Sequence, residues 1–365
     1  TRLLARLRDG HAAVRPGPKG KDVRWPDAPE APYTGPGMFL TVIGKKVYVK
    51  QAFGDAAAAG VEAGSELKKI DGKPALAWVA AREEKNADLM SFSTDHHRRF
   101  NTLHQGLASP RGTKWRLELV TPKRKKRKRT LTYAKSSARP QGPVAFPDAL
   151  KGDRDLQWAS LPDGLGYIHT TRCPRDLPEK IEGALDELGP RRGIILDLRG
   201  NSGGGFDHEG LMGRFIPKGK TLAFAKKYRS AGATTFGGPV VVIVAGTVVS
   251  AGETLAAIFR EDGRAYLIGE SPTAGMSSSK RTLDLPSGLF TLRVSVYSNM
   301  ARTAKGRGIE GYGVEPHEVV PYRPKDLARG VDTQLERARA ILKKGIPKKR
   351  VPYRPEAFVW KPPRR

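Results

Sequence analysis

The chain has 365 residues, enough for two or three domains with a sizeable core. Its 65 lysines and arginines exceed its 37 acidic residues, so the formal net charge is +28, and the excess is spread along the whole chain. Such a charge attracts anionic partners, and acidic peptides, lipid headgroups and cell-wall polymers fit as well as DNA. The single cysteine, Cys173, excludes an intramolecular disulfide, and no apolar stretch is long enough to cross a bilayer.

Residues 1–35 are expected to form an N-terminal helical fragment. A short helical pattern at the start gives way to a stretch rich in proline, glycine and lysine, without apolar periodicity. Such a stretch is typical of an irregular crossing between domains.

Residues 36–135 contain a stretch that resembles a PDZ domain. It runs over residues 59–72 with the sequence AGVEAGSELKKIDG. The resemblance implies that peptides are captured by strand addition at a sheet edge, with the terminal carboxylate held by backbone N–H groups. A long, largely helical insertion is expected between Pro74 and Gly112.

Seven consecutive basic residues, Lys123–Arg129, lie between two strand-like stretches at 115–120 and 130–133. Two alternating strands around a polar run predict a hairpin with the basic cluster at its exposed tip. The alternative is a nuclear signal or a nucleic-acid patch. This alternative is disfavoured, because no aromatic side chains are interleaved for stacking on bases.

Residues 136–345 alternate between strands and helices, which is typical of a layered α/β domain. The predicted strands are 166–170, 193–198, 240–245, 265–269 and 289–297, and the predicted helices are 178–188, 209–215, 252–260 and 332–342. Residues 346–365, rich in proline and arginine, are expected to be an irregular basic tail.

Ser250 has the position expected of a nucleophile. It follows an apolar, β-branched run at 238–246, which predicts a buried strand, and precedes residues 251–259, whose alanine and leucine content predicts a helix. Free backbone N–H groups and the helix dipole can there stabilise an oxyanion that forms beside the serine. The alternative is a serine that only caps the helix.

A second predicted strand, 193–199, runs into the glycine-rich loop 200–205, where the backbone can approach a ligand closely. The loop could supply a second oxyanion donor, or it could be only a flexible turn. It lacks the Lys-Ser/Thr ending of a phosphate loop and the spacing of a dinucleotide fingerprint, so nucleotide binding is not expected.

Three linked motifs resemble the C-terminal processing (tail-specific) serine protease family. They are DLRGNSGG at 197–204, SAGE at 250–253 and LIGESPTAG at 267–275. The resemblance implies a crotonase-like (ClpP-like) sheet with flanking helices and an inserted PDZ-like domain. One branch of the family pairs the serine with a lysine just after the Thr-x-Gly turn, where this chain has Met276, and Lys280 comes four residues later. The chain therefore matches better the tricorn-like branch, which uses a serine, an N-terminal histidine and a late glutamate.

The remaining triad members follow from the same resemblance. Residues 7–11 match the family's Leu-x-Asp-x-His segment, which implies that His11 is the general base. Residues 310–316 match its Glu-Gly-x-Gly-Val-x-Pro segment, which implies that Glu310 orients the histidine. The chemistry needs these groups, because a serine hydroxyl is a weak nucleophile until an oriented imidazole takes its proton. The alternatives are a histidine that only decorates a helix end and a solvent-facing loop acid.

Several further histidines carry no site prediction. They lack metal-ligand spacing and are interpreted as structural or solvated: His96, His97, His104, His169 and His208. His317 replaces an aspartate common in the family and is interpreted as a surface or structural substitution. No metal or organic cofactor is expected.

The sequence as a whole predicts a serine peptidase. Ser250 would attack the scissile carbonyl, and the N–H of Ala251 with that of Gly203 or Gly204 would form the oxyanion hole. The expected partners are polypeptide substrates, including C-terminal segments, and an anionic surface or polymer. The family favours a periplasmic or secreted location. Because the first residues already lie in the histidine motif, we expect further helix and an export signal before Thr1.

Two other classes of protein remain open. The first is a non-catalytic peptide- or ligand-binding protein on the same fold, in which the three groups would not converge. The second is a charge-driven nucleic-acid-binding protein, which would need a contiguous basic face.

Overall fold

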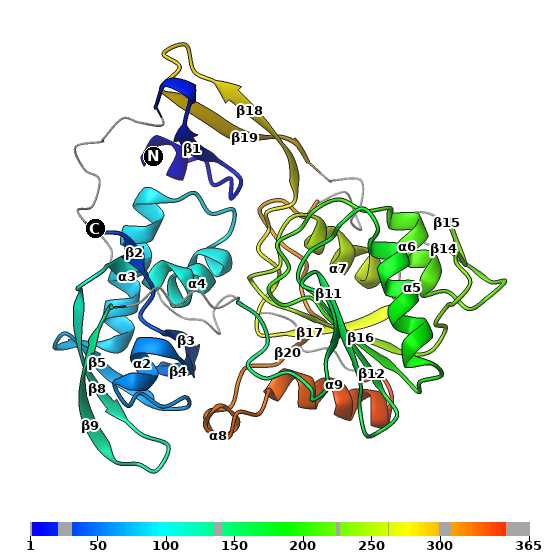
Figure 1. Cartoon of the computed structure of the whole chain (residues 1–365), viewed down its shortest axis with the longest axis horizontal. Helices are drawn as coiled ribbons and strands as arrows, with labels where there is room; N and C mark the ends of the chain where they lie inside the picture. Colours follow the sequence, from blue (N-terminus) through cyan, green and yellow to red (C-terminus); the bar gives the residue numbers. More distant parts are fainter. Residues whose placement is uncertain are drawn as a thin grey trace.

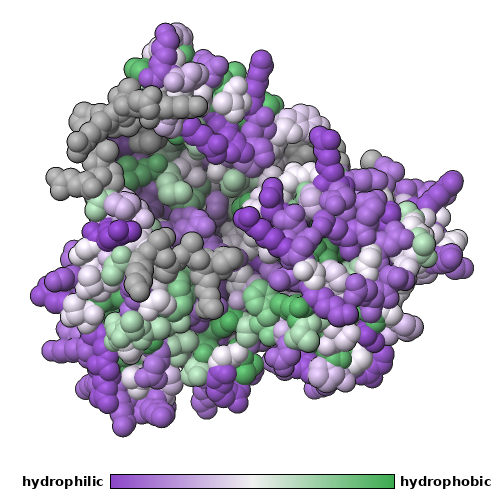
Figure 2. Space-filling model, in the orientation of Figure 1, coloured by the Kyte–Doolittle hydropathy of each residue, from purple (hydrophilic) through white to green (hydrophobic). Residues whose placement is uncertain are grey.

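The computed structural model describes residues 2–20, 31–134, 141–223, 227–261, 263–298 and 308–347. These residues form a small unit (33–133) and a large unit (141–269 and 308–347), each built on its own sheet, and a hairpin that projects beyond both (Figure 1). Hydrophilic residues cover the outer edges of both units on the face drawn in Figure 2.

The large unit contains a seven-stranded sheet in the order β10-β11-β12-β13-β16-β17-β20. Neighbouring strands from β12 to β20 are parallel, and β10 and β11 are antiparallel. The strands are β10 (Lys151–Gly152), β11 (Leu156–Ser160), β12 (Gly166–Thr170), β13 (Ile194–Asp197), β16 (Val240–Val244), β17 (Ala265–Gly269) and β20 (Glu318–Val319). The strands predicted from residue 166 to residue 269 therefore coincide with observed strands to within two residues.

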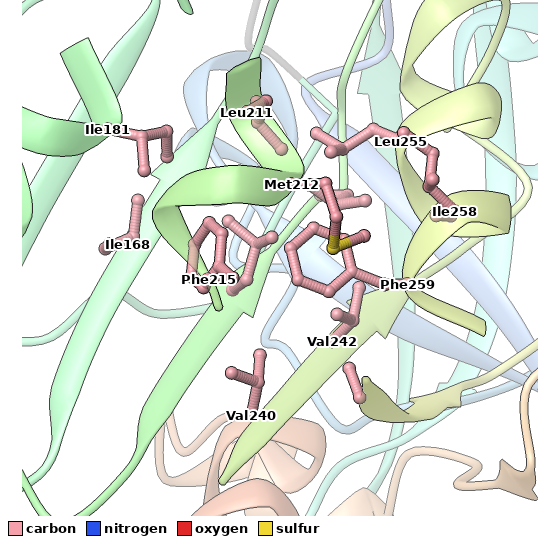
Figure 3. Packing of buried hydrophobic residues seen from close by; sticks show 14 of the residues in the cluster. Ile168, Ile181, Leu211, Met212, Phe215, Val240, Val242, Leu255, Ile258 and Phe259 are labelled. Carbon is pink, nitrogen blue, oxygen red and sulfur yellow. The ribbon is translucent and has the colours of Figure 1, made fainter. Parts of the chain in front are cut away.

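Helices cover both faces of this sheet, because strand side chains alternate between two cores. Val240 and Val242 belong to the core beneath α5 (Leu177–Leu188), α6 (His208–Arg214) and α7 (Ala251–Glu261). Val241 and Ile243 belong to the opposite core, which α9 (Thr333–Lys344) covers. Figure 3 shows the first core, where the rings of Phe215 and Phe259 meet edge to face with centroids 4.9 Å apart. The remaining elements of this unit are β14 (Thr221–Ala223), β15 (Lys227–Arg229) and α8 (Pro324–Ala328).

The small unit has a separate core and its own sheet, in the order β3-β4-β5-β8-β9 with β6 paired to β5. Its strands are β2 (Tyr33–Thr34), β3 (Met38–Ile43), β4 (Lys46–Ala52), β5 (Glu66–Ile70), β6 (Lys73–Pro74), β7 (Ser109–Pro110), β8 (Lys114–Val120) and β9 (Lys126–Thr132). Its helices are α2 (Gly54–Ala58), α3 (Ala75–Leu89), α4 (Asp95–Leu103) and the 3-10 turn η2 (Gln105–Leu107). Helices α3 and α4 occupy the stretch between Pro74 and Gly112.

The basic run does not lie only at a hairpin tip. Its last four residues, Lys126–Arg129, belong to β9 and pair with β8 along the strand. Long basic side chains are tolerated there because β9 is an edge strand, where their charged ends stay in water. The expected tip is therefore confined to the residues between the two strands.

The N-terminal segment is less helical than expected. Helix α1 covers only Arg2–Ala5, and β1 (Ala13–Pro16) then pairs with β19 (Phe290–Ser298), which also pairs with β18 (Ser278–Asp284). A proline at the end of β1 and another at the start of the 3-10 turn η1 (Pro18–Gly20) disfavour a longer helix. Part of the expected crossing, 21–30, and the tail from residue 348 lie outside the described residues.

Candidate active site

The candidate site lies at the carboxyl ends of the parallel strands, where the connecting loops meet at one sheet edge. The loop after β13 carries the glycines at 200–205, and the loop after β16 ends at Ser250. The loop after β17 covers 270–277 and leads into β18. The three motifs that are separate in the sequence are therefore neighbours in the fold.

Ser250 has a backbone conformation that serines rarely adopt. Its φ is +56°, in the left-handed region, directly before the first residue of α7. A left-handed non-glycine residue costs on the order of 1–3 kcal/mol and persists only where its surroundings impose it. Here the Ser250 N–H donates to the carbonyl of Met276 at 2.8 Å. A strained serine between a strand and a helix is also the geometry of a nucleophile elbow.

Glu253 fastens the loop after β17 to the serine turn. Its fully buried carboxylate accepts from the Thr273 hydroxyl at 2.6 Å and from the N–H groups of Gly275 and Met276 at 2.7 Å each. It also accepts from the Ser250 N–H at 3.2 Å. Burial raises the pKa of Glu253 to about 8, against the opposing effect of these donors. Sequence analysis assigned Glu253 no role, although a glutamate three residues after a helix-capping serine is a recognised capping pattern.

The glycine loop lies directly against the serine. A Cβ on Gly203 would lie 2.6 Å from the Ser250 Cβ and 3.1 Å from the Ala251 nitrogen. Only glycine leaves this space open. The Gly203 N–H itself donates to Asn201 Oδ1 at 2.8 Å, so it is engaged and does not point into the space as a free donor. Of the two glycines expected in the oxyanion hole, Gly204 therefore remains the candidate, with Ala251.

Arg199 anchors the start of the glycine loop. Its guanidinium, only 1% exposed, is paired with Asp197 at 2.6 Å and with Asp332 at 2.8 Å. It also donates to the Tyr322 hydroxyl at 3.1 Å. A buried cation needs such partners, because an unpaired one would be strongly destabilising. The pairing fixes the point where the loop leaves β13.

The His11 segment is held from three directions. Asp9 accepts from the backbone and hydroxyl of Ser295 on β19, both at 2.8 Å, and from the His11 N–H at 2.8 Å. The Gly10 N–H donates to the Ser93 hydroxyl at 2.8 Å, and a Cβ on Gly10 would lie 2.8 Å from the Met276 sulfur. The segment that carries His11 thus packs against the loop 270–277. The Met276 carbonyl of this loop accepts from the Ser250 N–H.

The imidazole of His11 is buried and its two nitrogens have different surroundings. Nδ1 lies 3.4 Å from the Ser278 hydroxyl, and Nε2 has no hydrogen-bond partner among the described residues. Burial lowers the pKa of His11 to about 4, and the positive charges of Lys280 and Arg293 act in the same direction, while Asp9 opposes them. His11 is therefore neutral at physiological pH.

Glu310 faces the same group of serines. Its Oε1 accepts from the Ser93 hydroxyl at 2.6 Å. Burial raises the pKa of Glu310, and Ser93 and Ser278 oppose the rise. Ser278 thus adjoins both the Glu310 carboxylate and His11 Nδ1. Ser278 is not among the site residues that the sequence predicts, and no sequence signal distinguishes it from its serine neighbours.

Lys280 contacts the serine directly. Its Nζ lies 3.4 Å from the Ser250 hydroxyl oxygen, and burial, followed by the charge of Arg293, lowers the pKa of Lys280. Sequence analysis set Lys280 aside as four residues late. It reaches the serine because the pairing of β18 with β19 shifts register between Ser279 and Lys280, which changes where the side chain points.

The structure gathers the three predicted triad residues around Ser278 and Met276 without direct hydrogen bonds between them. Neither His11 nor Glu310 contacts Ser250 by a hydrogen bond in the described part of the chain. Resting sites are often looser than the working arrangement.

The other histidines have structural contacts. Nε2 of His96 contacts the Thr273 carbonyl at 2.6 Å, and Nε2 of His169 contacts the Arg199 carbonyl at 2.9 Å. His317 is buried, accepts from the Leu267 N–H at 2.9 Å and stacks on Tyr266. Within the described ranges, no group of three or more His, Cys, Asp or Glu side chains is placed to hold a metal ion. The helices in those ranges also lack the length and apolar character needed to span a membrane.

The chain is similar in sequence to known peptidases. Residues 164–320 match the model of peptidase family S41. The carboxyl-terminal-processing protease of Picosynechococcus sp. is 29% identical over 189 residues, which cover 48% of this chain and 44% of that protein. The carboxy-terminal-processing protease of Bartonella bacilliformis is 25% identical over 350 residues, covering 90% of this chain and 70% of that protein. The chain thus spans less than half of the first relative and about two thirds of the second.

A solved structure shares the fold. The crystal structure of mature CPAF aligns with a TM-score of 0.69 at 13% identity, covering 96% of this chain and 88% of that one. Residues 164–320 thus resemble peptidase family S41, and the relatives named above are C-terminal processing proteases.

Proposed function

We propose that this protein hydrolyses peptide bonds in polypeptide substrates with Ser250 as nucleophile, His11 as general base and Glu310 as the acid that orients His11. One observation carries the proposal. His11 directs Nδ1 towards Ser278, beside Glu310, and its buried Nε2 has no hydrogen-bond partner in the part of the chain that the structure describes. In a serine triad Nδ1 faces the acid and Nε2 faces the serine, so the position of Nδ1 beside Ser278 and Glu310 supports this role.

The proposed reaction begins when His11 Nε2 takes the Ser250 proton as the hydroxyl oxygen attacks the scissile carbonyl carbon. The oxyanion is stabilised by the N–H of Ala251 and that of Gly204, at the positive end of α7. His11 then gives the proton to the leaving amine, and the acyl-enzyme remains on Ser250. A water molecule, deprotonated by His11, hydrolyses the ester and restores the serine.

Ser278 is proposed to connect the acid to the base. Its hydroxyl lies beside the Glu310 carboxylate and 3.4 Å from His11 Nδ1. Through this hydroxyl, the negative charge of Glu310 would stabilise the imidazolium that forms during attack. The arrangement is then a relay of four side chains.

A Ser250–Lys280 pair is a second candidate for the catalytic machinery, favoured by the 3.4 Å contact between Nζ and the hydroxyl. A lysine can act as base when its pKa is lowered, and burial lowers the pKa of Lys280. We favour His11, because Lys280 is more exposed than the imidazole and because its cation helps to keep His11 neutral.

Four variants separate the two candidates. Ser250→Ala should lower peptide hydrolysis by about 10⁴–10⁶-fold with folding intact. His11→Ala should lower it by a similar factor, and Lys280→Met by less than about tenfold, while Lys46→Met, at the exposed start of β4, serves as control. Full activity in Ser250→Ala would refute the nucleophile. Loss of activity in Lys280→Met but not in His11→Ala would assign the base to Lys280.

The resemblance to tail-specific proteases and the positive net charge suggest how substrates reach the site. The small unit is proposed to be a PDZ-like module that captures C-terminal segments by strand addition. The net charge of +28 favours acidic substrates or an anionic surface near the site of action. Action outside the cytoplasm, in the periplasm or the medium, is proposed from the tail-specific family.

A further inference from the structure

Lys50 is a buried lysine at the junction of the two units. It lies on β4 of the small unit, and its Nζ pairs with Glu270 Oε1 of the large unit at 2.9 Å. The Lys50 side chain is 3% exposed and that of Glu270 is 11% exposed. Surface ion pairs contribute little, but a buried pair is costly to desolvate and strongly destabilising to break.

Aromatic groups complete the surroundings of this cation. Nζ lies 4.6 Å from the ring centroid of Tyr322 and 5.1 Å from that of Phe100, and 3.3 Å from His104 Nε2. Ring faces attract cations, most strongly where water is excluded. Tyr322 belongs to the large unit, whereas Phe100 and His104 belong to the small unit, so Lys50 binds groups from both.

The contact to Glu270 leads to the loop that holds the serine. Glu270 is the first residue after β17, at the start of the loop 270–277. Three residues of this loop, Thr273, Gly275 and Met276, donate to the Glu253 carboxylate. The Met276 carbonyl in turn accepts from the Ser250 N–H. A shift of Glu270 would therefore act on the serine turn.

The contact to Tyr322 leads to the other side of the serine. The Tyr322 hydroxyl accepts from Arg199 Nη1 at 3.1 Å, and Arg199 anchors the glycine loop through Asp197 and Asp332. That loop carries Gly203, whose lack of a side chain leaves room beside the Ser250 Cβ. One lysine of the small unit thus touches the supports of both loops that frame the serine.

We propose that Lys50 is a positioning residue that couples the small unit to both active-site loops, so that the placement of the small unit sets the reactivity of Ser250. The proposal rests on the proposed peptidase function for its effect on rate. Its structural part, the restraint of the two loops, is independent of that function.

The test compares Lys50→Met with Lys46→Met. Lys46 lies on the same strand and pairs with Glu66 at the surface, so it is a matched control. We expect Lys50→Met to lower kcat for a labelled casein substrate by about 10–100-fold with little change in KM, because misplacement of reacting groups by about 1 Å can cost that much. The rate at which a fluorophosphonate labels Ser250 should fall by a similar factor, and Lys46→Met should stay within about twofold of the wild type.

Hydrogen exchange supplies a readout that needs no activity. Amides in the segments 199–204 and 270–277 should exchange faster in Lys50→Met than in Lys46→Met, under conditions where both are folded. If the wild type neither hydrolyses casein nor reacts with the probe, the peptidase proposal fails and exchange alone decides the coupling.

A second variant guards against a Lys50→Met protein that does not fold. Glu270→Gln keeps the side-chain shape and removes only the charge, and it should loosen the 270–277 segment in the same way. Exchange and labelling that match the wild type in a folded Lys50→Met protein, or in Glu270→Gln, would overturn the proposal. A lower melting temperature with unchanged kcat and exchange would show that Lys50 has only a structural role, and would overturn it too.

Discussion

The roles proposed for Ser250 and His11 depend on their local surroundings. The left-handed backbone of Ser250 is held by the Met276 carbonyl and by Glu253, so the strain is sustained by hydrogen bonds around the turn. His11 is kept neutral by burial and by nearby positive charge. Because only a neutral imidazole accepts a proton, His11 would remain competent in the proposed role of base well below the usual pH range for histidine.

The pKa of His11 gives a prediction at this scale. In a nuclear magnetic resonance titration of the unliganded enzyme, the His11 ring should titrate with a midpoint of about 4. Lys280→Met should raise the midpoint, because a nearby cation disfavours the imidazolium. As pH falls from the unperturbed value of about 6.5 towards 4, the unfolded chain binds the proton first, so the free energy of unfolding should decrease. A midpoint above about 6 in the wild type would contradict this account of the burial.

Among the elements, the glycine loop and the β18–β19 hairpin define the site. Gly203 leaves room beside Ser250. Strand β18 brings Ser278 to His11 and Lys280 to Ser250. The hairpin also carries Ser295, which holds Asp9 and with it the His11 segment. The position of His11, the proposed base, therefore depends on a hairpin that is remote from it in sequence.

Replacing Gly203 by alanine tests the closeness of the loop. The new Cβ would meet the Ser250 Cβ at 2.6 Å, and φ at Gly203 is +82°. Gly72, with φ +79° and nothing within 4 Å, is the matched control for the backbone penalty. Both variants should lose roughly 1–2 kcal/mol of stability. Only Gly203→Ala should also lose hydrolysis, by about 100-fold. Equal activities of the two variants would show that the contact is unimportant.

The sequence predicted much of this arrangement and missed the parts that depend on register. The apolar runs around Ser250 predicted its strand and helix correctly, because hydrophobic periodicity and turn residues are local signals. The approach of Lys280 was not predictable, since the shift of register in β18 has no local sequence signal. The short N-terminal helix was overestimated, because pairing of β1 with β19 is a non-local contact.

At the scale of the whole molecule, two sheets with separate cores are joined by polar contacts that include the buried Lys50–Glu270 pair. The net charge of +28 acts over the whole molecule. A field of this sign accelerates encounter with acidic ligands and is screened by salt.

Salt dependence tests the effect of this charge. For an acidic peptide substrate, kcat/KM should fall by about tenfold between low and physiological ionic strength, because the association rate depends on electrostatic steering. A neutral peptide with the same cleavage site should change by less than about twofold over that range. Equal salt responses of the two peptides would show that the positive charge does not act on substrate encounter.

The central claim is that Ser250 is an activated nucleophile. The most direct measurement is to incubate the protein with a fluorophosphonate and to locate the adduct by peptide mass spectrometry. We predict a single adduct on Ser250, formed at a rate that falls by at least about 100-fold in His11→Ala, since the serine is a weak nucleophile without its base. An adduct on another residue, or labelling of Ser250 at an unchanged rate in His11→Ala, would contradict the account.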